Sequence, residues 1–176
     1  MQKWLNLALE FGFSRAFPLD CTTFTIHPEI RELCTINRCG MYGRCWTCPP
    51  ACDSLKNCAQ ILSQYHSGLL VELVYPLDDP FDIEGMMDAG KLHQERFLAF
   101  VRKLRETWPN LLPLSANTCT FCKECTYPAA PCRFPETAFS PIEAFGLIVS
   151  EICETNKIPC LYEDKTIALI GCCLLE

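Results

Sequence analysis

Residues 69–75 have the sequence LLVELVY, a run with the composition of a buried β-strand that a proline ends. Apolar side chains then recur at helical spacing over residues 83–108, and a proline follows as a stop signal. Residues 111–116 have the composition of a second strand. Strand, long helix and strand in this order are typical of a βαβ crossover. The sequence therefore predicts an α+β fold: a small mixed sheet with one βαβ crossover, further helices and two cysteine-rich metal-binding loops.

Weaker patterns predict further elements on the N-terminal side of this unit. A short helix is expected before Gly12, followed by an irregular or strand-like segment. Asp53 is a suitable N-cap for a helix whose apolar residues recur as far as Tyr65 and which ends at Gly68. The chain contains neither a repeat of fixed period nor a long linker. Residues 1–176 are therefore predicted to form a single domain.

The C-terminal part shows a helix start and a possible hairpin. Ser140, Pro141 and Glu143 form the pattern of a capping box, with proline at the first helical position. We expect a helix from there to about Asn156, and we assign Glu143 to the capping box rather than to catalysis. Two β-prone runs on either side of residues 163–165 predict a β-hairpin.

The composition excludes several classes of protein. The chain has 176 residues, of which 49% are hydrophobic, and this apolar content excludes a disordered chain. Its 15 Lys and Arg against 21 Asp and Glu give a formal net charge of −6, which does not suit a nucleic-acid partner. The apolar stretches are too short to span a bilayer, and the first twenty residues do not resemble a signal peptide. We therefore expect a cytoplasmic protein with no nucleic-acid or membrane partner.

Cysteine is the unusual feature of the composition, because it occupies 15 of the 176 positions. The cytoplasm keeps thiols reduced, so we expect these side chains to be metal ligands, catalytic groups or buried apolar groups. They are clustered along the chain. Seven lie from Cys21 to Cys58, none lies between Cys58 and Cys119, four lie from Cys119 to Cys132, and four follow Cys132. The two dense blocks are the candidate metal-binding segments.

The second block has the spacing of an iron–sulfur site. Cys119, Cys122 and Cys125 follow one another at intervals of three, which directs successive thiolates toward one centre, as in ferredoxin-type loops. Cys132 supplies a fourth thiolate after six intervening residues, where bacterial ferredoxins have three and then a proline. Zinc ribbons instead pair two C-x2-C units. The spacing favours a [4Fe-4S] cluster and leaves zinc as the alternative, since four thiolates suit both.

The first block has more cysteines than one four-ligand site requires: Cys34, Cys39, Cys45, Cys48, Cys52 and Cys58. Cys45 and Cys48 form a C-x-x-C unit, which in thioredoxin-type redox sites stands at the start of a helix. Pro49 and Pro50 follow directly and disfavour that geometry. Cys58 shares the helical phase of the apolar residues around it, so a core position is the alternative to metal ligation there.

Several motifs in combination resemble one known family. They are residues 34–43 (CTINRCGMYG), 46–50 (WTCPP), 119–128 (CTFCKECTYP), 131–136 (PCRFPE) and 143–146 (EAFG). Through them the chain from about residue 30 onward resembles an uncharacterised cysteine-rich family described as predicted metal-binding proteins of unknown function.

The resemblance implies two sets of four metal ligands. The first set is Cys34, Cys39, Cys48 and Cys58, and the second set is Cys119, Cys122, Cys125 and Cys132. Cys45 and Cys52 lie where the family pattern has other residues, and either of them remains an alternative to Cys58. The family has no established reaction, so the resemblance supports metal binding without indicating a catalytic residue.

Three functions are compatible with these observations. The first is a protein with two [4Fe-4S] clusters that passes electrons to or from a redox partner protein. The second is a zinc-stabilised interaction module, and the third is an enzyme with an open iron site in one cluster. We predict the first. Basic and aromatic side chains within the motifs are expected to offset the charge of the clusters and to shield them from water: Arg38, Arg44, Lys123, Arg133, Tyr42, Trp46, Phe121, Tyr127 and Phe134.

The remaining cysteines and the histidines are assigned no chemistry. Five cysteines outside the ligand sets are expected to be buried thiols that behave as small apolar groups: Cys21, Cys153, Cys160, Cys172 and Cys173. The three histidines, His27, His66 and His93, are isolated in the sequence, and we expect structural or surface positions for them.

Overall fold

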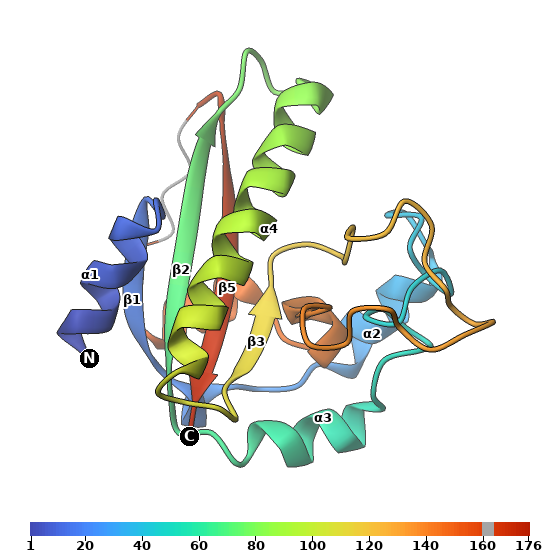
Figure 1. Ribbon diagram of the computed structural model, residues 1–176, viewed down its shortest axis with the longest axis horizontal. Helices are drawn as coiled ribbons and strands as arrows, with labels where there is room; N and C mark the ends of the chain where they lie inside the picture. Colours follow the sequence, from blue (N-terminus) through green and yellow to red (C-terminus); the bar gives the residue numbers. More distant parts are fainter. Residues whose placement is uncertain (160–163) are drawn as a thin grey trace.

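The computed structural model describes residues 1–159 and 164–176, which form a five-stranded mixed sheet in the order β1-β2-β5-β3-β4 (Figure 1). The strands are β1 (Arg15–Asp20), β2 (Ser67–Pro76), β3 (Leu112–Ser115), β4 (Ser140–Pro141) and β5 (Thr166–Leu175). Neighbouring strands are antiparallel except β3 and β4, which are parallel. The α+β fold with a small mixed sheet is confirmed.

The predicted crossover is present, with one strand inserted in it. The chain leaves β2, passes through helix α4 (Ile83–Arg105) and returns as β3. Strand β5 lies between β2 and β3 and runs antiparallel to both, so β2 and β3 are parallel without being neighbours. Helix α4 begins at Asp82, whose carboxylate accepts a hydrogen bond from the Gly85 N–H at 2.8 Å, and it ends three residues before the expected Trp108.

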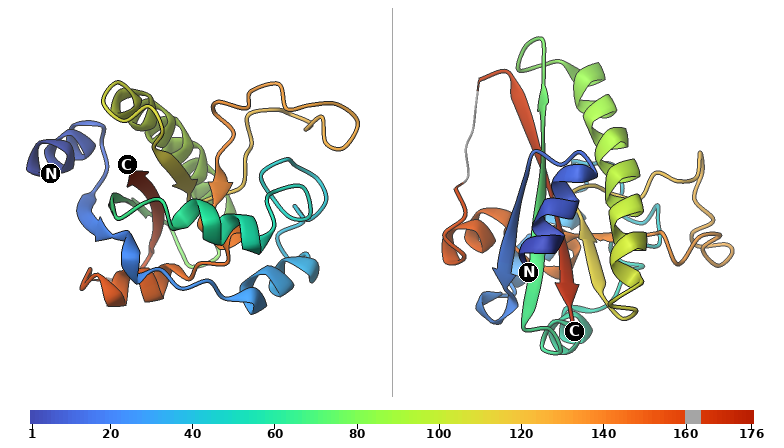
Figure 2. Two further views of the ribbon diagram at one scale, coloured as in Figure 1. Left: turned by 90° about the horizontal axis from the view of Figure 1, so that it is seen from below. Right: turned by 60° about the vertical axis from the view of Figure 1, so that its left-hand side comes forward.

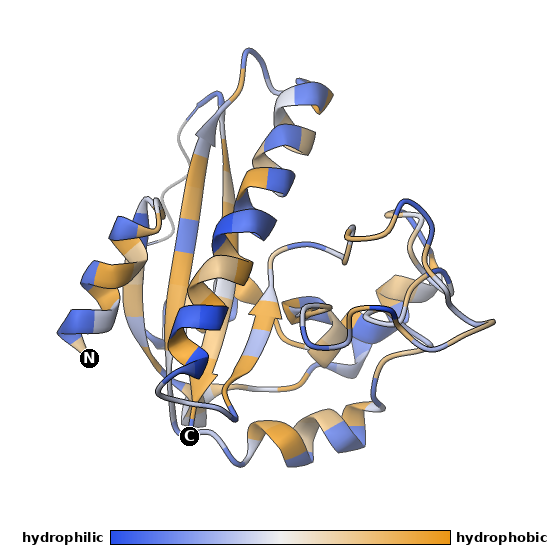
Figure 3. Ribbon diagram, viewed as in Figure 1, coloured by the Kyte–Doolittle hydropathy of each residue, from blue (hydrophilic) through white to orange (hydrophobic). Residues whose placement is uncertain are grey.

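Helices cover both faces of the sheet. Helices α1 (Gln2–Glu10) and α4 pack on one face, whereas α3 (Leu55–Leu62) and α5 (Val149–Thr155) pack on the other (Figure 2). The central strands β2 and β5 are apolar along most of their length, as both of their faces are buried (Figure 3). The aromatic ring of Phe97 on α4 approaches β5 at Gly171, where a Cβ atom would lie only 2.6 Å from the ring. Glycine there permits close packing of α4 on the sheet.

The predicted helix over residues 140–156 is wrong in its first half. Ser140 and Pro141 form β4 beside β3, and a short 3₁₀ helix, η2 (Ile142–Phe145), follows without a side-chain cap. Gly146 then adopts the left-handed conformation with φ 73°, and a Cβ atom on it would lie 3.0 Å from side chains of two neighbouring segments. This turn separates η2 from α5, so the capping box does not form.

The other sequence predictions have mixed outcomes. The helix before Gly12 is confirmed as α1. The helix predicted from Asp53 is present as α3, but its N-cap is Ser54, whose hydroxyl accepts from the Asn57 N–H at 3.2 Å. The second arm of the predicted hairpin is β5, while the first arm, from Pro159 to the turn at residues 163–165, falls mostly outside the described residues. No helix in the described part of the chain is long and apolar enough to cross a membrane.

Candidate metal centre

The two cysteine blocks meet beside the sheet. The loop over residues 36–54 and the loop over residues 116–139 lie next to each other at the edge remote from α1 (Figures 1 and 2). The indole of Trp46 contacts the ring of Tyr127 edge-on, with ring centroids 5.0 Å apart. The same indole N–H donates to the carbonyl oxygen of Ala130 at 3.1 Å. Residues more than eighty positions apart in the sequence are thereby held together.

Five thiols line one small cavity at this junction. All four cysteines of the second predicted set line it, and Cys45 from the first block joins them. The cavity has a volume of about 20 Å³. Cys45 is 1% exposed, whereas the other four thiols are partly exposed. All four thiols of the second set therefore line the same cavity, together with a cysteine that sequence reasoning had set aside.

Aromatic and basic side chains also line the cavity. Trp46, Phe121 and Phe134 line it, as does Arg133, whose guanidinium donates to the carbonyl oxygen of Glu124 at 3.0 Å. Four of the nine side chains expected to surround a metal centre therefore line this cavity.

The thiols around the cavity influence one another electrostatically. Burial raises the pKa of Cys119, and the neighbouring thiols Cys45, Cys132 and Cys122 raise it further. Hydrogen bonds from Cys48 and then Thr47 lower the pKa of Cys45 to about 6, against the effect of burial. The pKa of Cys48 is raised because its thiol proton is held by Cys45. Cys45 is therefore the thiol that ionises first in this pair.

The Cys45–Cys48 unit lies in a series of turns and does not begin a helix. This described segment therefore lacks the thioredoxin-type geometry, as Pro49 and Pro50 predicted. No helix N-terminus is present here to stabilise a thiolate, as it does in such redox sites.

One cation, Arg31, influences three thiols of the first block. Arg31 on helix α2 (Pro28–Thr35) donates to the carbonyl oxygen of Ala144 and, at 2.8 Å, to that of Asp53. Burial raises the pKa values of Cys34, Cys52 and Cys58, and the guanidinium of Arg31 lowers all three. The guanidinium of Arg31, which two backbone carbonyls hold, thus favours the ionised form of three thiols of this block.

Electrostatic effects relate several thiols of the first block to one another. Cys39 raises the pKa of Cys34, Cys52 raises that of Cys48, and Cys58 raises that of Cys52. Cys39 is exposed, while Cys58 is 1% exposed and packs in the core on the α3 face. Cys52 thus connects two members of the predicted set.

Within residues 1–159 and 164–176, no three His, Cys, Asp or Glu side chains are placed so that they hold one metal ion. Both ligand sets stay predictions.

Comparison with known proteins identifies one family. A family model described as "Predicted metal-binding protein (DUF2284)" matches residues 18–175. The chain belongs to this family. The match includes both cysteine blocks and confirms the resemblance seen in the sequence, without assigning the metal or its ligands. No curated protein and no solved structure matches the chain.

Four cysteines of this DUF2284 protein are core residues, as expected. Cys21, Cys153, Cys172 and Cys173 are all at most 5% exposed. Cys172 and Cys173 are adjacent in β5 and therefore pack on opposite faces of the sheet. Cys160, for which the same was predicted, lies outside the described residues.

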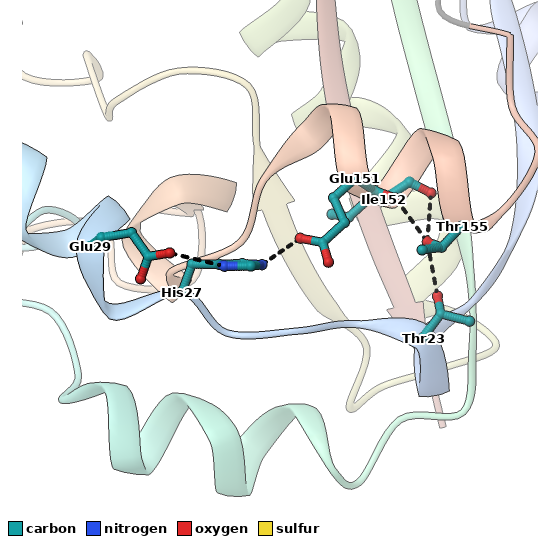
Figure 4. A network of polar contacts seen from close by, with 6 residues as sticks. All are labelled: Thr23, His27, Glu29, Glu151, Ile152 and Thr155. Carbon is teal, nitrogen blue, oxygen red and sulfur yellow. Dashed lines mark hydrogen bonds and ion pairs between the residues drawn. The ribbon is translucent and has the colours of Figure 1, made fainter.

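The histidines of the DUF2284 protein occupy three different environments. His27 lies between two carboxylates, with its Nε2 atom 2.5 Å from Glu151 and its Nδ1 atom 3.2 Å from Glu29 (Figure 4). Hydrogen bonding to Glu151 is the main reason that its pKa is raised. His93 is fully buried, and burial lowers its pKa to about 4. His66 is exposed.

A second cavity, of about 210 Å³, contains the two carboxylates Glu72 and Glu143. Glu72 lies in the apolar strand β2 and is 3% exposed, and it forms a two-point ion pair with Arg15 at 2.8 and 2.9 Å. Desolvation raises the pKa values of both carboxyl groups. Sequence reasoning passed over Glu72, although a single charge within an apolar strand was a signal for it. Glu143 lines this cavity instead of capping a helix.

Proposed function

We propose that this DUF2284 protein binds two [4Fe-4S] clusters and passes single electrons to or from a partner protein. The observation that carries the proposal is the cavity lined by Cys45, Cys119, Cys122, Cys125 and Cys132. Thiolates are the ligands of such clusters, and three of these follow one another at the ferredoxin-type interval.

The surroundings of the cavity support an electron-transfer site. Aromatic side chains limit the access of water, and the shell around a cluster tunes its reduction potential. Trp46, Phe121 and Phe134 supply that shell here, and Phe134 is 49% exposed. A bound cluster would supply one-electron chemistry. These residues would limit the access of water to it and would leave it near the surface, where a redox partner would dock.

The first block supports a second centre through its charge. A [4Fe-4S] cluster with four thiolates has a net charge of about −2 in its oxidised form. Arg31 lies among Cys34, Cys52 and Cys58 and offsets part of that charge. A cation held on backbone carbonyls from two segments stays in place as the thiols ionise.

A zinc-stabilised interaction module is the second candidate, and the size of the cavity favours it. A volume of about 20 Å³ is close to that of one water-sized sphere, which suits a single ion. Four thiolates around one zinc ion have Zn–S distances of about 2.3 Å. Zinc would tie the two loops together without redox chemistry.

Metal analysis of anaerobically purified protein tests the two candidates. Two clusters predict about eight iron and eight sulfide per chain, together with a broad absorbance near ~400 nm that dithionite bleaches. A colourless protein with stoichiometric zinc and no iron after anaerobic reconstitution would contradict the cluster proposal and support the zinc module. The absence of both metals would contradict metal binding altogether.

A further inference from the structure

The cavity at the junction of the two loops holds one thiol more than a four-ligand centre uses. Cys119, Cys122, Cys125 and Cys132 complete the predicted set, and Cys45 is the fifth. Both a zinc ion and a [4Fe-4S] cluster take four cysteine ligands. One thiol is therefore left over at whichever centre forms here.

Cys45 is held toward the cavity by its neighbours in the chain. The next residue, Trp46, is anchored by the ring of Tyr127 and the carbonyl oxygen of Ala130. The hydroxyl of the residue after it, Thr47, is 3.5 Å from the Cys45 sulfur, and Thr47 is itself 4% exposed. With a thiol that is 1% exposed and anchored neighbours, Cys45 has little freedom to turn away.

Cys45 and Cys132 line the same cavity and reach it from different loops. Cys132 is separated by six residues from the evenly spaced run, and its sulfur accepts a hydrogen bond from the backbone N–H of Phe134 at 3.4 Å. Of the four predicted ligands, Cys132 is thus the one that the chain reaches last, after a separation of six residues.

We propose that Cys45 and Cys132 are exchangeable ligands of the second centre, each able to complete it when the other is absent. The inference rests on the proposed metal binding, and it holds for iron–sulfur and zinc alike. On exchange, the entering thiol loses its proton to solvent and the departing thiolate regains one, so no electron is transferred. With Cys45 as a ligand, the centre links the two cysteine blocks covalently through the metal.

Metal content of serine variants tests the exchange. We expect Cys45→Ser and Cys132→Ser each to retain the metal of both centres, and the double variant to lose the metal of the second centre, which is half of the total. The metal of the first centre then serves as an internal control of folding. A matched double variant, Cys132→Ser with Cys173→Ala, removes a core thiol on the α4 face of the sheet and should bind as Cys132→Ser does.

The outcomes separate this inference from the proposed function. If Cys132→Ser alone, or Cys45→Ser alone, loses the second centre, or if the double variant retains it, exchange is wrong while metal binding stands. If the wild-type chain binds neither iron nor zinc, the proposed metal binding and the ligand exchange are both wrong. If the double variant loses the metal of both centres, the exchange is likewise contradicted, because it requires the first centre to survive.

Discussion

The guanidinium of Arg31 and the thiol of Cys58 meet at one backbone oxygen, the carbonyl of Asp53. Arg31 donates to it at 2.8 Å, and the sulfur of Cys58 lies 3.8 Å from it. The carbonyl thus places a fixed cation beside a thiol that is 1% exposed. A charge so close to a desolvated sulfur favours the thiolate form that a metal requires.

Replacing Arg31 by Gln should make the thiols of the first block harder to ionise. Since Arg31 lowers the pKa values of Cys34 and Cys52, the metal-free variant should be alkylated more slowly at these residues at pH 8. Peptide mapping after timed alkylation measures the rates. Arg31→Lys, which keeps the charge, is the control, and its alkylation rate should decrease less. Equal alkylation rates in wild type and Arg31→Gln would show that Arg31 does not influence the ionisation of these thiols.

Cys125→Ser should abolish the second centre and leave the first. Cys125 lines the cavity at the end of the evenly spaced run, and metal-binding energy also stabilises the folded loop. We expect half of the wild-type metal and easier proteolysis of residues 116–139. Cys173→Ala, a core change remote from the loops, should keep the full metal content. Full metal in Cys125→Ser would show that the second ligand set is wrong.

His93 should make the fold sensitive to mild acid. Its folded pKa, about 4, lies below the ordinary value of 6.5, so the unfolded chain binds the proton more tightly. The contribution of neutral His93 to the free energy of unfolding is therefore present above pH 6.5 and is lost as the pH falls toward 4. Between pH 7.5 and 5.0 the loss should be about 2 kcal/mol.

Urea unfolding of wild type and His93→Leu at these two pH values measures this loss. The variant should lose less stability on acidification, while His66→Gln, at an exposed position, should behave as wild type. An identical pH dependence in wild type and His93→Leu would rule out His93 as the source.

The ion pair between His27 and Glu151 should act in the opposite direction. Because the folded pKa of His27 is raised, its contribution is fully present below the ordinary histidine pKa and disappears as the pH rises through the folded value. Glu151→Gln should therefore lower the melting temperature more at pH 6 than at pH 9. Glu154→Gln, at an exposed position of the same helix, is the matched control. A drop of equal size at both pH values would mean that the pair contributes no charge interaction.

Replacing only one partner of the ion pair between Arg15 and Glu72 should destabilise the folded protein. Arg15→Met leaves the carboxylate of Glu72 buried in β2 without its partner, and such changes cost about 3 kcal/mol or more. Replacing both residues by Met removes the uncompensated charge and should recover most of the loss. Chemical unfolding of the two single variants and the double variant measures the coupling. Additive losses would show that the two side chains do not interact.

Local patterns in the sequence were sufficient for most of the fold. The helical spacing over residues 83–108 and the apolar run over residues 69–75 predicted α4 and β2 because both patterns reflect burial against one sheet. The insertion of β5 between β2 and β3 was not predictable in this way. Strand order depends on which distant segments pair, and no local pattern records it.

The capping-box prediction failed because tertiary contacts outweigh a local helix signal. Ser140 and Pro141 carry a valid helix start, yet they pair with β3, and Gly146 ends the short turn after them. Ile142 and Phe145 are buried on the α3 face, and the free energy of burying these two side chains exceeds the contribution of one cap. Glu143 is consequently left to line the cavity that also contains Glu72.

For the candidate metal-binding segments, the spacing of the cysteines alone predicted that Cys119, Cys122 and Cys125 face a common point, because that spacing is a property of a short loop. Only the tertiary structure decided that Cys45 lies with them and that Arg31 lies among the thiols of the first block. The physical reason is that both relationships join segments far apart in the sequence. They depend on how Trp46 docks on the second loop and how α2 packs against η2, and such contacts form only when the whole chain has folded.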